Sequence, residues 1–162
     1  SKVFYSCTFV SLVDHPMGNR HKAREIAIQL LYQLDALGCT AQEALKPYFA
    51  AHPVNSETRT FAEEFVTGTV ENIQNIDSLL REVSEHWSLE RILPVDLSIL
   101  RLAAFELLYL GTPPAVAIDE AIRLAKRFSS KEASAFINGV LDKVKELGIV
   151  AANGYATPGG QV

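Results

Sequence analysis

The four histidines and two cysteines are the side chains of this sequence best suited to hold a metal ion, and their spacing does not favour such a site. They are scattered along the chain, at His15, His21, His52, His86, Cys7 and Cys39. No His-Glu-x-x-His, Cys-x-x-Cys or glycine-rich phosphate-binding motif occurs. Neighbouring carboxylates such as Asp119 and Glu120 fit a solvated helix face. The pattern predicts binding surfaces rather than a reaction centre, so we expect no catalysis, metal or cofactor.

One cluster of basic side chains stands out, although the net charge of the chain is −4. The first helical pattern opens with Arg20, His21, Lys22 and Arg24, where the helix dipole disfavours cations. Guanidinium groups beside the free N–H groups of a helix start form a good phosphate site. An ordinary solvated surface is the alternative interpretation.

A second basic cluster comprises Arg123, Lys126, Arg127 and Lys131, with no acidic residue between them. Cations near a helix C-terminus complement its carbonyl groups, so a structural role is the alternative to phosphate binding. The segment 57–90 has the opposite sign, with eight acidic residues against two arginines. It either keeps the protein in solution or attracts a basic partner.

Two aromatic residues, Tyr32 and Phe136, lie on amphipathic helical patterns. Core packing is one interpretation of such rings. The other is stacking on an unpaired base, which is how single-stranded RNA is commonly bound.

The segment from about residue 19 to residue 148 predicts helices throughout, and therefore an all-α fold. In the first helix, the apolar side chains recur on one face, at Ala23, Ile26, Ala27, Leu30, Leu31 and Leu34. Gly38 is placed to end that helix. Thr40 and Glu43 have the capping-box spacing that starts a second helix, which runs through Tyr48.

Five further helices are predicted in the rest of this segment. Two cover residues 56–75 and 77–87, and a third starts at Pro94 and stops at Gly111. A sixth helix overall follows Pro114. The seventh opens at Ser129, which has capping-box spacing to Glu132, and closes at Gly148.

The two ends of the chain differ in character from the helical segment. Met17 is the only methionine, so we expect residues 1–18 to be an N-terminal extension that is non-native or disordered. The apolar stretch 3–13 is too short to span a bilayer, which needs about 20 residues. We expect residues 149–162 to be a flexible tail. Free cysteines fit a reducing cytoplasm.

Four segments carry a resemblance to a known family. They are residues 20–32 (RHKAREIAIQLLY), 96–107 (DLSILRLAAFEL), 114–128 (PAVAIDEAIRLAKRF) and 136–143 (FINGVLDK). In this order and spacing they resemble the signature segments of the NusB family, over about residues 19–147.

The resemblance implies about seven helices in two subdomains, residues 19–75 and 76–148. It also implies an RNA-binding transcription antitermination factor rather than an enzyme. NusB proteins recognise boxA RNA of nascent ribosomal RNA transcripts together with the ribosomal protein NusE. That complex joins the other Nus factors in the RNA polymerase elongation complex.

Site residues follow from the resemblance by position. The predicted RNA-binding set is Arg20, His21, Lys22, Arg24, Tyr32, Lys126, Lys131, Glu132 and Phe136, with phosphate contacts from the basic residues of the first helix and base stacking by the two aromatic rings. Glu90 and Asp96 fall where the family contacts its basic ribosomal partner. His21 and Ala135 replace residues that are often basic or polar in the family, so we expect NusE to complete the RNA site.

Two other interpretations stay open. A NusB-like domain of an rRNA cytosine methyltransferase would need a large catalytic domain, and this sequence has no Rossmann pattern for one. A self-associated homodimer would instead hide the RNA surface. Under the preferred interpretation, Arg20, Lys22 and Arg24 share one exterior patch with Phe136.

Overall fold

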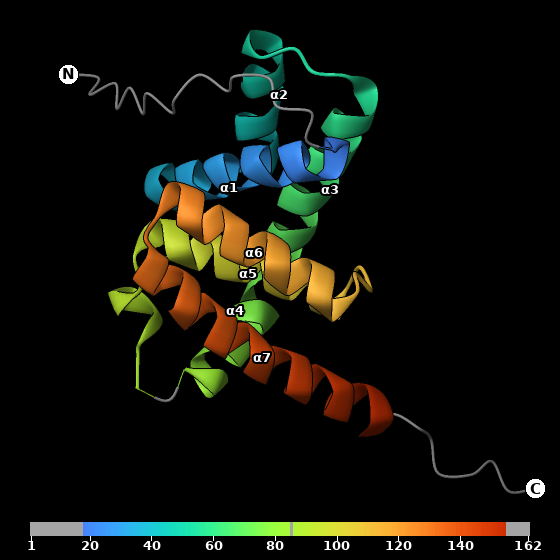
Figure 1. The fold of residues 1–162 in the computed structure, drawn as a ribbon. Coiled ribbons are helices and arrows are strands. Elements are labelled where there is room, and N and C mark those ends of the chain that lie inside the picture. The colour runs from blue at the N-terminus through green and yellow to red at the C-terminus, as the bar shows by residue number, and fades with distance from the viewer. Residues whose placement is uncertain (1–17, 85, 155–162) are drawn as a thin grey trace, which may run out of the picture.

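Seven α-helices and one short 3-10 helix make up the described part of the chain (Figure 1). The structure is a computed structural model that describes residues 18–84 and 86–154, with the backbone alone for 149–154. In chain order the elements are α1 (Asn19–Leu37), α2 (Ala41–Ala51), α3 (Ser56–Glu71), α4 (Ile73–Val83), η1 (Leu89–Arg91), α5 (Pro94–Leu108), α6 (Pro114–Phe128) and α7 (Lys131–Gly154). No strand occurs among these residues, and the predicted all-α fold is confirmed.

Helix α1 lies in the middle of the molecule, between α2 and α3 on one side and α5 and α6 on the other (Figure 1). The six apolar residues predicted to face inward are all buried. Four more side chains are buried on other faces of the helix, at His21, Arg24, Glu25 and Ile28. The helix is therefore covered on several faces, and it ends at Gly38, whose φ of 65° is left-handed.

Helix α5 is the second central element and packs against α1, α3, α4, α6 and α7. Its contact with α3 is close, because a Cβ added at Gly68 would lie 2.1 Å from Cζ of Phe105. Buried residues of α1 and α5 belong to a single core cluster. The division into subdomains at residues 75 and 76 stays a prediction.

Two predicted helix ends in the middle of the chain need correction. Helix α3 ends at Glu71 rather than near residue 75, because the side-chain amide of Asn72 donates to the carbonyl oxygen of Gly68 at 2.8 Å. Helix α4 ends at Val83, four residues before the predicted end. Trp87 therefore lies outside any helix, between α4 and η1.

Both predicted ends of the last helix also differ from the structure. The capping oxygen belongs to Ser130, which accepts from the backbone N–H of Ala133 at 3.0 Å, and not to Ser129. Gly148 lies inside α7, which continues to Gly154. The tail predicted from residue 149 thus begins with helical backbone. The predicted extension lies outside the described residues except for Gly18, which caps α1.

The described helices do not include one with the length and apolar character needed to cross a membrane. In Figure 1, α6 lies over α5 beside α1, and α7 crosses below them. The α6–α7 turn and the α4–α5 connection come close together at one end of this arrangement, on the left of the figure.

Candidate nucleic-acid interface

Two of the basic residues predicted to contact phosphate, Arg20 and Lys22, lie at or near the surface at the start of α1. Arg20 is exposed, and its guanidinium carbon lies 4.7 Å from the centroid of the Phe61 ring in α3. Lys22 is half-buried. No side chain caps the helix start and its first turn contains no acid, so the N-terminal N–H groups and these two cations act in the same direction on an anion.

Six ionisable side chains of α1, α5 and α6 form a network that is largely buried and ends at the exposed Arg127: His21, Arg24, Glu25, Glu106, Glu120 and Arg127. Arg24 is 5% exposed and donates to both carboxylate oxygens of Glu106, with distances from 2.7 to 3.2 Å. His21 is also buried, with Nδ1 2.5 Å from Glu120 and Nε2 3.3 Å from Glu25. Arg127 pairs with Glu25 from the other side.

The burial of Arg24 and His21 corrects the prediction that they contact RNA. Both side chains are already engaged by carboxylates, and drawing Arg24 away would leave Glu106 charged and buried without a partner. The network itself was missed by sequence reasoning. A signal was present, because Arg24 lies one and two turns before Ile28 and Leu31, on a second apolar line of α1.

Exposed cations flank the α6–α7 turn, as predicted from the second basic cluster. Lys126 and Lys131 are exposed, and neither has an ion-pair partner in the described part of the chain. Glu132, also exposed, lies in the first turn of α7, where the helix dipole favours an acid. Both lysines are therefore free to meet a phosphate group.

An aromatic pair lies where the connection after α4 meets the start of α7. The rings of Trp87 and Phe136 are 6.1 Å apart, with an interplanar angle of 64°. Phe136 is half-buried against the core, whereas Trp87 is 54% exposed. An exposed indole supported by a second ring is a suitable stacking surface for a base. We call Trp87, Lys126, Lys131, Glu132 and Phe136 the α6–α7 face.

Trp87 was not among the predicted site residues. The sequence predicted it as the last residue of the fourth helix, whereas the structure places it in the connection after α4. The available signal was its position after the last apolar residue of that helical pattern, together with its being the only tryptophan of the chain.

The structure does not bring the start of α1 and Phe136 into one patch, contrary to the prediction. Arg20 lies against α3, whereas Phe136 lies against Trp87. In Figure 1, the first turn of α1 is at the right-hand end of that helix, and α7 begins on the left. The molecule therefore has two separate cationic areas. Tyr32 is 38% exposed on α1 and has no hydrogen bond or ring contact with another described residue.

The two predicted partner contacts differ in exposure. Glu90 is exposed in η1. Asp96 is 5% exposed in the first turn of α5, and its Oδ1 has no hydrogen-bond partner among the described residues. Asp96 is therefore a buried carboxylate, and its contact with the ribosomal partner stays a prediction. The first turn of α5 favours an acid there for the same reason as in α7.

The comparisons with known proteins decide which family this fold belongs to. The family model described as the NusB family matches residues 21–146, which is most of the chain. The chain belongs to the NusB family. It is 41% identical over 131 residues to transcription antitermination protein NusB of Sorangium cellulosum, covering 80% of this chain and 94% of that protein. To NusB of Lysinibacillus sphaericus it is 44% identical over 128 residues, covering 78% and 97%.

Solved NusB structures share the fold. NusB of T. maritima matches with a TM-score of 0.73 and 31% identity, covering 83% of this chain and 93% of that one. A crystal structure of antitermination factors NusB and NusE in complex with dsRNA matches with a TM-score of 0.73 and 28% identity. That match covers 80% of this chain and 97% of the NusB-family chain in the complex.

Proposed function

We propose that this chain is a transcription antitermination factor of the NusB family that binds boxA RNA of nascent ribosomal RNA together with NusE. The observation that carries the proposal is family membership over residues 21–146, joined to a likeness in fold to a NusB chain complexed with NusE and RNA. It acts as an adaptor in the RNA polymerase elongation complex with other Nus factors, in the cytoplasm, and not as an enzyme. The named relatives favour this function over the methyltransferase domain.

The α6–α7 face is the proposed main RNA surface. Lys126 and Lys131 supply charge for the phosphates, and the rings of Trp87 and Phe136 supply a stacking surface for unpaired bases. Glu132 belongs to this face and can accept hydrogen bonds from base edges.

Arg20, Lys22 and Tyr32 are proposed as a second contact area. An RNA that touches both areas must cross the molecule, since the two cationic areas are separate (Figure 1). A single chain with net charge −4 attracts RNA weakly at long range, which supports a role for the NusE partner in completing the site.

The salt dependence of RNA affinity tests the proposed surface. RNA affinity is measured by fluorescence anisotropy with boxA RNA and NusE at several salt concentrations. The variant Lys126→Ala/Lys131→Ala should lower the slope of log affinity against log salt by about 1.4, because each lost contact to a phosphate of a single strand contributes about 0.7 to the slope. The control, Lys46→Ala/Arg59→Ala, removes the same charge from α2 and α3 and should keep the slope. Equal slopes for the two variants would place the RNA elsewhere.

A partner experiment tests the proposed NusE surface. Glu90→Lys reverses an exposed charge without disturbing the core, so NusE affinity should fall while helicity stays the same. Asp96→Lys is unsuitable, because it would bury a lysine. Unchanged NusE affinity in Glu90→Lys would move the interface away from η1. Light scattering with and without RNA checks the homodimer alternative.

A further inference from the structure

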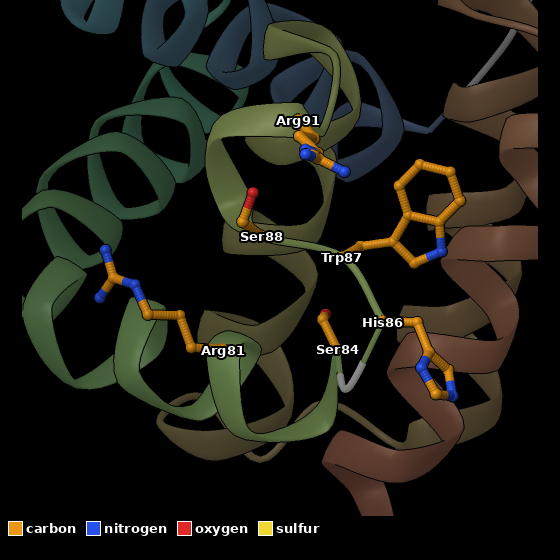
Figure 2. Close-up of a pocket in the computed structure, with 6 residues that line it drawn as sticks. All are labelled: Arg81, Ser84, His86, Trp87, Ser88 and Arg91. Carbon is orange, nitrogen blue, oxygen red and sulfur yellow. The ribbon is translucent and has the colours of Figure 1, made fainter.

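A shallow pocket opens between the end of α4 and η1, with a volume of about 440 Å³ (Figure 2). Its lining consists of Arg81, Ser84, His86, Trp87, Ser88 and Arg91. No carboxylate lines it among the described residues. In Figure 2, the Arg91 guanidinium extends toward the Trp87 indole, Ser84 lies between α4 and the following loop, and Arg81 extends outward from α4.

The two arginines of this pocket are the ones without a partner in the described part of the chain. Each of the other arginines contacts a carboxylate or an aromatic ring: Arg20, Arg24, Arg59, Arg101, Arg123 and Arg127. Arg81 and Arg91 are exposed and have neither kind of contact. Their charges are uncompensated and lie in one concave site, which raises the local positive potential.

A buried hydroxyl adds a second, independent observation. Ser84 is 7% exposed, and its Oγ has no hydrogen-bond partner among the described residues. A buried polar group without a partner is unfavourable, and an anion in the pocket would provide an acceptor for this O–H. The C-terminal carbonyls of α4 would repel an anion, but Lys143 Nζ lies 3.4 Å from the carbonyl oxygen of Val83 and offsets this effect.

We propose that this pocket binds a phosphodiester group of single-stranded RNA while the adjoining base stacks on Trp87. The inference rests on the proposed RNA-binding function and adds a subsite to it. The Ser84 hydroxyl donates to a phosphate oxygen, the Arg91 guanidinium binds the phosphate beside Trp87, and Arg81 adds positive charge at the far edge of the pocket. Trp87 belongs both to the pocket and to the α6–α7 face, so a strand held on that face continues directly into the pocket.

The single tryptophan gives a local probe of this subsite. Titrating the full chain, complexed with NusE, with a single-stranded boxA RNA should quench the fluorescence of Trp87, provided that NusE is supplied without tryptophan. Arg81→Gln/Arg91→Gln should weaken RNA binding about tenfold, the effect of losing one charge-assisted hydrogen bond. The salt slope should fall by about 0.7 or more.

A matched control separates the pocket from net charge. Lys46→Gln/Arg59→Gln removes the same two charges from exposed positions on α2 and α3, and should bind RNA like the unmodified chain. Melting curves and NusE affinity are measured for both variants. The inference is overturned if the pocket variant binds RNA like this control, or if it loses NusE instead of RNA. If the unmodified complex binds no RNA, the proposed function itself fails.

Discussion

Replacement of Arg24 with methionine probes whether this residue holds the fold together rather than binding RNA. Glu106 is 2% exposed, and without Arg24 the one side chain of the described residues that still bonds its carboxylate is Thr112, whose hydroxyl lies at 3.3 Å. Removing one partner of a buried ion pair costs about 3–5 kcal/mol, because the other charge stays buried. With a urea dependence of about 2 kcal/mol per molar, the unfolding midpoint should fall by about 2 M.

An exposed pair with a similar separation provides the control. Arg59 Nε lies 2.8 Å from Glu63, as close as the buried contacts, but both side chains are about half exposed. Arg59→Met should therefore cost about 0–1 kcal/mol. Urea unfolding followed by circular dichroism compares the two variants. A midpoint shift for Arg24→Met no larger than that for Arg59→Met would refute the burial argument.

Removing both charges of the buried pair sharpens the test. Arg24→Met/Glu106→Leu leaves no lone carboxylate, so it should recover part of the stability that Arg24→Met loses. The salt slope of RNA binding by this double variant should equal that of the unmodified chain, because Arg24 does not reach the surface. A lower slope for the double variant would show that Arg24 contacts RNA.

Two further predictions concern packing and pH. Gly68→Ala should destabilise the protein by about 1–3 kcal/mol, because the added Cβ collides with Phe105. Gly139→Ala places its Cβ in open space and should stabilise α7 by about 0.5–1 kcal/mol. Thermal melts compare the two variants, and equal melting temperatures would contradict the packing at Gly68. Burial, and then the charge of Glu25, raise the pKa of Tyr48, so the fold favours the neutral phenol. The stability that the neutral Tyr48 phenol contributes is present below about pH 10 and is lost as the pH rises through the pKa of Tyr48 in the folded protein. In urea unfolding, Tyr48→Phe should reduce this loss of stability at alkaline pH. An unchanged loss would exclude Tyr48 as its source.

Helix positions were predictable from the sequence because they depend on local spacing. Three signals act within a few residues: the apolar stripe of α1, the capping box at Thr40 and Glu43, and the proline at the start of α5. The predicted helix ends were wrong where a side-chain contact decides the end of the helix. Asn72 and Ser130 end or begin helices through hydrogen bonds that neighbouring residues could equally have made.

The arrangement of the site depended on contacts that spacing does not specify. Arg24 was predicted to be a surface cation, because its partner Glu106 lies 82 residues later in the sequence, on α5. Trp87 was predicted to be the last residue of a helix, because the end of α4 was placed four residues too late. By contrast, Lys126, Lys131 and Glu132 lie at the surface as their polar sequence context predicts.

Photo-crosslinking measures most directly where RNA lies on this protein. The complex of the chain with NusE is irradiated with boxA RNA carrying photoreactive uridines, and the crosslinked peptides are identified by mass spectrometry. Crosslinks to Trp87 and to the first turns of α7 near Phe136 are expected. Crosslinks confined to α2 and α3, with none on the α6–α7 face, would contradict the proposed RNA surface.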